Sequence, residues 1–178
     1  MFDGSTASPI PRFIDFLSGG LEMRMFVAVD FTASNGMPGD PRSLHHMRPG
    51  YFNEYKPEKK YFVTSICAQT GPNRYQQAIA TIGDILQSYD SSKLFAAYGF
   101  GGLVHKVTSH CFALNGVPES PCVQRVQGIL DAYEKALLNV GLSGPTNFAP
   151  VVSTVAQAVQ SFHQVQNAHP SSKRTTMH

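Results

Sequence analysis

The feature that most constrains the fold is an uninterrupted apolar run over residues 25–29, which ends directly at Asp30. A strand with one wet face alternates apolar and polar side chains, whereas a strand covered on both faces is apolar at every position. The run therefore predicts a strand buried between two layers, as in the parallel sheet of an α/β domain. Open α/β sheets collect ligands at the carboxyl ends of their strands, so we expect a site in the residues that follow Val29.

The remaining patterns agree with an α/β class. Apolar residues at helical spacing predict three helices, and two further apolar segments predict strands. The predicted helices are 73–89, 120–140 and 150–162, and the predicted strands are 94–100 and 107–114. The order is therefore strand, helix, strand, strand, helix, helix, which fits a single domain in a chain of 178 residues.

Composition argues against several classes of protein. The net charge of +2 is small and the basic residues are scattered, so no nucleic-acid partner and no direct membrane contact are expected. The three cysteines, Cys67, Cys111 and Cys122, lack the spacing of a metal site and indicate reduced thiols in a cytoplasmic protein. The sequence GFGG at 99–102 lacks phosphate-binding spacing and no nucleophile elbow is present, so we expect no enzyme. Surface or packing roles are expected for the adjacent histidines at 45 and 46.

Three oxygen-bearing side chains, Asp30, Thr32 and Ser34, alternate in the loop after the first strand. Carboxylate, hydroxyl and water oxygens suit a hard cation such as Mg²⁺ or Mn²⁺ rather than zinc, which prefers nitrogen and sulfur. An Asp-x-Thr-x-Ser sequence also fits an Asx-type turn, in which the carboxylate only bonds the backbone. Taken alone, this loop leaves both interpretations open.

A series of six motifs, one of which contains the loop itself, gives the loop a context. In chain order they are FIDFLSGG, VAVDFTASNG, SLHHMRP, YDSSKLFAAYGFGG, FALNG and GPTNFAP. This series resembles the von Willebrand factor A domain of copines over most of residues 13–163. The resemblance implies a Rossmann-like, doubly wound sheet that is partial and C-terminally truncated, with a metal-ion-dependent adhesion site.

The resemblance also implies the ligands of that site. In the family pattern an Asp-x-Ser-x-Ser loop and a threonine from a later loop hold a divalent cation. Asp30, Thr32 and Ser34 match the first loop, with threonine in place of the first serine, and Thr146 matches the later threonine. The family pattern ends with an aspartate in a Thr-Asp-Gly turn, and residues 164–178 contain no aspartate. A site for Mg²⁺ or Mn²⁺ is therefore expected, but an incomplete one.

Composition and comparison with the family pattern together divide the chain. Residues 1–12 are expected to be a linker, 13–163 a partial copine-type domain with an insertion at 49–71, and 164–178 a disordered tail. The absence of later strands predicts that 25–29 is left with an unpaired apolar edge, which favours aggregation.

The implied function is a non-catalytic, divalent-cation-dependent protein-binding module, whose partner offers a carboxylate to the ion. Copines as a family are intracellular, calcium-dependent phospholipid-binding proteins, and the resemblance assigns lipid binding to C2 domains that this sequence lacks. Membrane contact and plasma-membrane association are thus expected only of a full-length parent. Two alternatives stay open: a copine-like domain of a RING-type ubiquitin ligase, whose Cys/His spacing is absent here, and a degenerate domain without metal.

Overall fold

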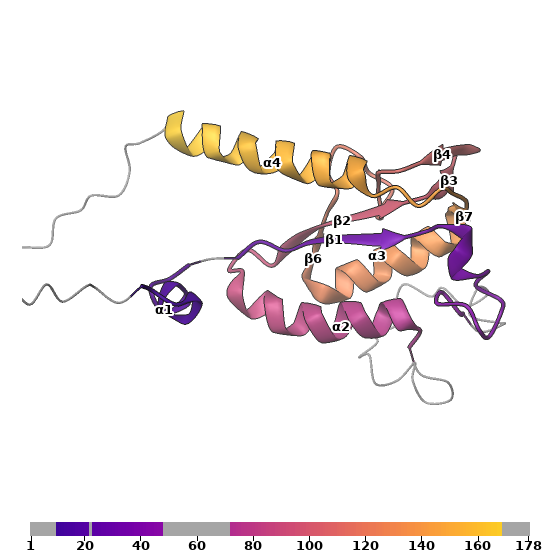
Figure 1. Ribbon diagram of the computed structural model, residues 1–178, viewed down its shortest axis with the longest axis horizontal. Helices are drawn as coiled ribbons and strands as arrows, with labels where there is room; N and C mark the ends of the chain where they lie inside the picture. The colour runs from indigo at the N-terminus through magenta and orange to yellow at the C-terminus, as the bar shows by residue number, and fades with distance from the viewer. Residues whose placement is uncertain (1–9, 22, 48–71, 169–178) are drawn as a thin grey trace, which may run out of the picture.

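The computed structural model describes residues 10–21, 23–47 and 72–168 (Figure 1). The predicted insertion at 49–71, most of the predicted linker and the end of the predicted tail lie outside these ranges.

The described residues alternate between helices and strands, which confirms the predicted α/β class. The elements are α1 (Phe13–Ser18), β1 (Phe26–Asp30), the 3₁₀ helix η1 (Ala33–Asn35), α2 (Arg74–Leu86), the 3₁₀ helix η4 (Gln87–Tyr89), β2 (Leu94–Phe100), β3 (Gly102–Val104), β4 (Val107–Ser109), β5 (Phe112–Ala113), β6 (Cys122–Gln124), α3 (Arg125–Asn139), β7 (Gly141–Leu142) and α4 (Ala149–Ala168).

The main sheet is built on β2. On one side β2 pairs in parallel with β1, from Phe26 opposite Ala96 to Asp30 opposite Phe100. On its other side it pairs antiparallel with two short strands, β5 near its carboxyl end and β6 near its start. A second, three-stranded sheet follows the order β4, β3, β7.

Helices cover both faces of the main sheet, with α2 and α3 on one side and α4 on the other (Figure 1). Side chains that alternate along each strand enter two cores. Val29 and Phe95 pack with Ile129 of α3, whereas Phe26 and Phe100 pack toward α4. With helices on both faces, β1 has no side that is wholly exposed to water, which agrees with its apolar sequence, although Val29 is its one buried residue and Ala28 is exposed.

Two boundaries differ from the sequence prediction. The helix expected from residue 120 begins at Arg125, because residues 122–124 pair with Leu94–Ala96 as strand β6. The strand expected at 107–114 divides into β4 and β5, which join different sheets. In both cases pairing with a distant strand outweighs the local pattern.

Helix α4 continues to Ala168, five residues into the segment predicted as a disordered tail. The start of α2, in contrast, follows the sequence closely. The Asn73 side chain accepts from the Gln76 amide, and the Gln76 side chain accepts from the Asn73 amide, each at 2.9 Å. In the part of the chain that the structure describes, no helix combines the length and the apolar character needed to cross a bilayer.

Candidate metal centre

Backbone pairing brings the two predicted loops together at the carboxyl end of β1. The Phe31 amide donates to the Phe100 carbonyl at 2.8 Å, which extends the β1–β2 pairing by one residue. Beyond it, the Ala33 amide donates to the Ser143 carbonyl at 2.6 Å, and the Ser143 amide donates to the Phe31 carbonyl at 3.2 Å. The loop after β7 is thereby fastened to the loop after β1, and Thr146 follows three residues later.

All four predicted residues meet in this place. The Thr146 hydroxyl donates to Thr32 Oγ1 at 3.2 Å, and Thr32 Oγ1 lies 3.1 Å from Ser34 Oγ. The Thr32 side chain is 2% exposed, whereas Ser34 and Thr146 are exposed to solvent. The half-buried Asp30 joins the group through the Thr32 amide, which donates to Asp30 Oδ1 at 2.8 Å. A role for these residues as metal ligands stays a prediction.

The bond between Asp30 and the Thr32 amide is also the bond of an Asx-type turn. It engages one carboxylate oxygen, and an ionised carboxylate has about four acceptor positions in all. The turn and a metal ligand are therefore compatible uses of the same side chain.

The donor set fits a hard divalent cation. It consists of one carboxylate and three hydroxyls, the oxygen chemistry that Mg²⁺ and Mn²⁺ prefer. Over 10–21, 23–47 and 72–168, no three His, Cys, Asp or Glu side chains gather in a way that could hold a metal. The four residues carry a single negative charge, so a bound cation would keep a positive charge for water and for an outside ligand.

Asn35 braces the loop, a role that the sequence pattern did not reveal. Its Nδ2 donates to the carbonyls of Asp30 and Thr32, both at 3.2 Å, and its Oδ1 accepts from the Tyr75 hydroxyl at 3.3 Å. Asparagine commonly bonds nearby backbone in this way, so its presence in DFTASNG was the available signal.

His45 contacts the same loop from the interior of the protein, where it is fully buried. A carbonyl can only accept, so His45 Nε2 carries the proton and donates to the Asp30 carbonyl at 2.8 Å. The neutral ring then accepts at Nδ1 from the Tyr133 hydroxyl at 2.8 Å, and Tyr133 accepts from Asn73 Nδ2 at 3.1 Å. The predicted packing role of His45 is thus a specific one: it holds the last carbonyl of β1.

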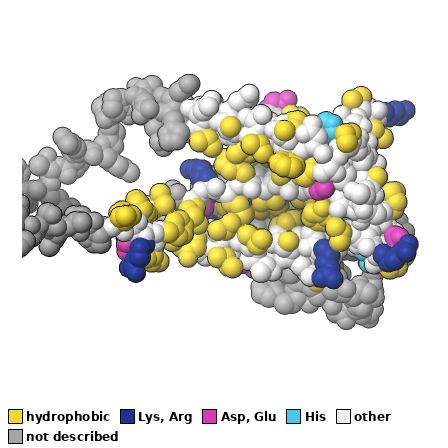
Figure 2. Space-filling view, in the orientation of Figure 1, with side chains coloured by type: hydrophobic (Ala, Val, Ile, Leu, Met, Phe, Trp, Pro, Cys, Tyr) yellow, Lys and Arg dark blue, Asp and Glu magenta, His cyan; other side chains and the backbone are white. Residues whose placement is uncertain are grey.

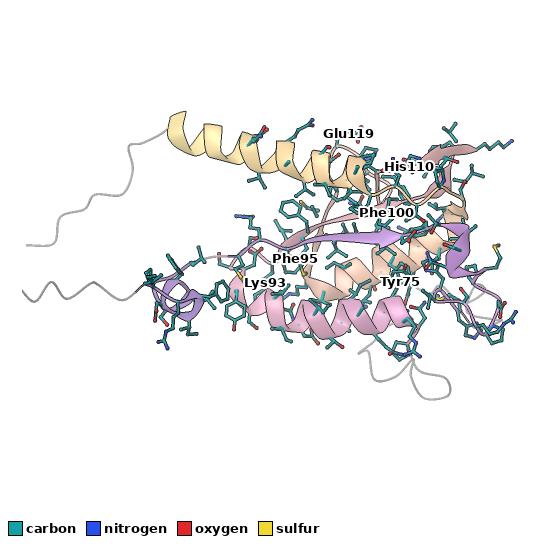
Figure 3. All side chains as sticks on the ribbon, viewed as in Figure 1. Tyr75, Lys93, Phe95, Phe100, His110 and Glu119 are labelled. Carbon is teal, nitrogen blue, oxygen red and sulfur yellow. The ribbon has the colours of Figure 1, made fainter. Side chains whose placement is uncertain are left out.

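Two tyrosines complete this buried group. Tyr75 extends from α2 toward the end of β1 (Figure 3), and its ring stacks on His45 with centroids 4.5 Å apart. Burial, with a smaller effect of the Asp30 charge, raises the pKa of Tyr75 to about 12, and burial also raises the pKa of Tyr133. Both phenols therefore keep their protons and serve as hydrogen-bond donors.

Comparison with known proteins gives the family. Residues 63–170 match the family model described as Copine. The chain belongs to the copine family. The matched region begins inside the segment predicted as an insertion and runs past residue 163.

Curated copine relatives align with most of the chain. It is 42% identical over 153 residues to nicotinic receptor-associated protein 1 of Caenorhabditis briggsae, which covers 85% of this chain and 21% of that protein. It is 41% identical over 145 residues to protein BONZAI 1 of Arabidopsis thaliana and 42% identical over 146 residues to protein BONZAI 2, each covering 81% of this chain and 22% of the relative. The chain thus spans about a fifth of the length of these relatives.

Gly101 sets the position of Thr32, and its replacement by alanine should destabilise the fold. Its φ is +70°, and an added Cβ would collide with Thr32 Cγ2. For Gly101→Ala we expect a loss of more than about 1 kcal/mol in the free energy of unfolding, measured in urea. Gly39→Ala is the matched control, because a Cβ there meets no atom within 4 Å. Equal stability of the two variants would contradict the close approach.

Protonation of His45 should destabilise the folded protein. Burial lowers its pKa below the ordinary value of 6.5, while the bond to the Asp30 carbonyl and the Asp30 charge oppose the shift. As the pH drops below about 6.5, His45 therefore takes up a proton more readily in the unfolded chain than in the folded chain. The free energy of unfolding falls with it, by at most about 1.4 kcal/mol per pH unit. Protonation also forces the Tyr133 hydroxyl to give up its acceptor.

The measurement is urea unfolding at a series of pH values between neutrality and mild acid. His45→Gln should flatten the dependence on pH, whereas His105→Gln, at an exposed position, should leave it unchanged. An unaltered slope in His45→Gln would show that another group carries the effect.

Proposed function

We propose that this copine chain is a non-catalytic, divalent-cation-dependent protein-binding module. The observation that carries the proposal is the convergence of three hydroxyls beside Asp30: Thr32 Oγ1 lies 3.1 Å from Ser34 Oγ and 3.2 Å from Thr146 Oγ1. These four residues would hold Mg²⁺ or Mn²⁺. When bound, the cation would supply a positive charge that a carboxylate of a protein partner can ligate.

The proposed roles of the four residues differ with their exposure to solvent. Asp30 supplies the only formal charge, and its backbone is held by His45 and Asn35. Buried Thr32 lies at the centre of the hydroxyl group, while Ser34 and Thr146 lie at the surface, where a partner can reach them. The loop is thus fixed from inside and open on the outside, as a binding site requires.

The hydrogen bonds of His45, whose ring contacts the Asp30 backbone, favour a binding role over catalysis. Both ring nitrogens of His45 are engaged, with the Asp30 carbonyl and with the Tyr133 hydroxyl. A general base needs a free lone pair within reach of its substrate, and His45 is fully buried.

We propose further that a full-length parent is cytoplasmic and reaches the plasma membrane only through C2 domains. Calcium-dependent phospholipid binding would belong to those domains and not to this chain. One relative bears the name nicotinic receptor-associated protein, which refers to association with another protein. That name agrees with a protein partner for the present module.

Calorimetric titration with Mg²⁺ and Mn²⁺ tests the cation site. Asp30→Asn keeps an oxygen that can accept from the Thr32 amide, so it preserves the turn and removes the charge. We expect it to weaken binding at least about 10-fold, or about 1.4 kcal/mol. Thr146→Val should weaken binding several-fold, and Asp84→Asn, on the exposed side of α2, should have no effect. Undiminished binding in Asp30→Asn contradicts the site, and no binding by the wild type favours the alternative without metal.

Acetate can stand in for the carboxylate of a partner. In NMR spectra of the protein with Mg²⁺, excess acetate should shift the amide signals of Ser34 and Thr146, because both lie at the exposed side of the site. Without Mg²⁺, or in Asp30→Asn, the shifts should disappear. Shifts that do not depend on Mg²⁺ would mean that acetate binds without the cation.

A further inference from the structure

The hairpin formed by β3 and β4 continues from the carboxyl end of β2 and lies beside the candidate metal centre. Gly101, the residue before β3, approaches Thr32 so closely that an added Cβ would collide with its side chain. Strand β3 also pairs with β7, and Thr108 Oγ1 lies 2.8 Å from Ser143 Oγ, three residues before Thr146. Figure 1 shows the hairpin and η1 at the same end of the main sheet. The hairpin is therefore fixed to both loops that carry the predicted ligands.

The turn of this hairpin consists of two residues with unfavourable backbone angles. His105 and Lys106 join β3 to β4 with φ angles of +49° and +67°. Two-residue turns that need a positive φ at both positions favour Asn and Gly, and larger side chains are disfavoured there. Both side chains are exposed, so neither contributes to a core. Backbone strain of this kind is concentrated at functional sites, which points to a contact made by the turn.

The segments that form this side of the centre contain no acidic residue. The sequence has no Asp or Glu between Asp90 and Glu119, and none over residues 135–168. Lys106 forms no ion pair with any residue in the described ranges. On the face that Figure 2 shows, the region of β3 and β4 carries basic and apolar side chains and no acidic one. A bound cation and Lys106 would together attract carboxylates and repel basic groups.

Apolar side chains lie between the turn and the centre. Leu103 is 38% exposed and Val107 is 68% exposed. Leu103 pairs with Thr108, and Val107 pairs with Val104, so the two apolar side chains lie on opposite faces of the hairpin. A rise of about 3.3 Å per residue places the turn roughly 13 Å from Gly101. An extended segment of a partner covers that distance with about four residues.

We propose that the partner of this module is an extended acidic segment with two carboxylates about four residues apart. The first carboxylate ligates the cation, and the second pairs with Lys106 at the turn of the hairpin. This inference rests on the proposed function for the first contact and adds the second. An apolar residue between the two carboxylates meets Leu103 or Val107. A segment with a single carboxylate would leave Lys106 without an opposite charge, and a basic segment would be repelled.

Two acetylated and amidated peptides test the proposal in NMR titrations of the full chain with Mg²⁺ at low salt. One is Asp-Thr-Val-Thr-Glu, and the other has Gln in place of Glu. We expect the Glu peptide to bind the wild type about threefold more tightly, as befits an exposed ion pair, and to shift the Lys106 amide signal. In Lys106→Gln the two peptides should bind equally. Arg125→Gln is the matched control and should keep the difference, because Arg125 is also exposed but bonds the Lys93 carbonyl at the opposite end of β2.

Equal binding of the two peptides by the wild type, a difference that persists in Lys106→Gln, or an unshifted Lys106 amide would each overturn the proposal. Titrations without Mg²⁺ separate it from the proposed function. If Mg²⁺ strengthens the binding of neither peptide, the cation-bridged contact fails, while the comparison of Glu with Gln still measures the contact at Lys106. If Mg²⁺ strengthens both peptides equally and Glu has no advantage, the proposed function stands and the hairpin contact fails.

Discussion

The hydrogen bond from His45 to the Asp30 carbonyl is the contact on which the rest of the site depends. Through Tyr133 and Asn73, the same chain of bonds reaches α3 and the first residue before α2. One buried group therefore fixes the end of a strand relative to two helices. Because the donors and acceptors of His45, Tyr133 and Asn73 match in one consistent direction, the group specifies one arrangement of these elements.

The parts of the molecule around β1 differ in how many contacts support them. The two faces of the sheet are covered by helices, and the carboxyl end of β1 is tied down by side chains and by the Ser143 backbone. The free edge of β1 has no comparable support among the described residues.

The class of fold and the meeting of Asp30, Thr32, Ser34 and Thr146 were predictable from the sequence. An apolar strand that ends in oxygen-bearing residues is a local signal, and the motif GPTNFAP supplied the later threonine. The support given by His45 was not predictable, because its partner Tyr133 lies 88 residues away and only packing brings them together. The predicted start of α3 was wrong for a related reason. Ser120 and Pro121 resemble a helix start, but the residues that follow, 122–124, pair with β2 as a strand.

The bond between Thr146 and Thr32 joins residues 114 positions apart, and this separation determines when the site can exist. Closing so long a loop costs conformational entropy, which the packing of the two cores offsets. An unfolded chain therefore has no assembled site, and a ligand that binds only the folded form raises its apparent stability by mass action. The hydroxyl cluster therefore forms only when the loop after β1 and the loop between β7 and α4 have reached their folded positions.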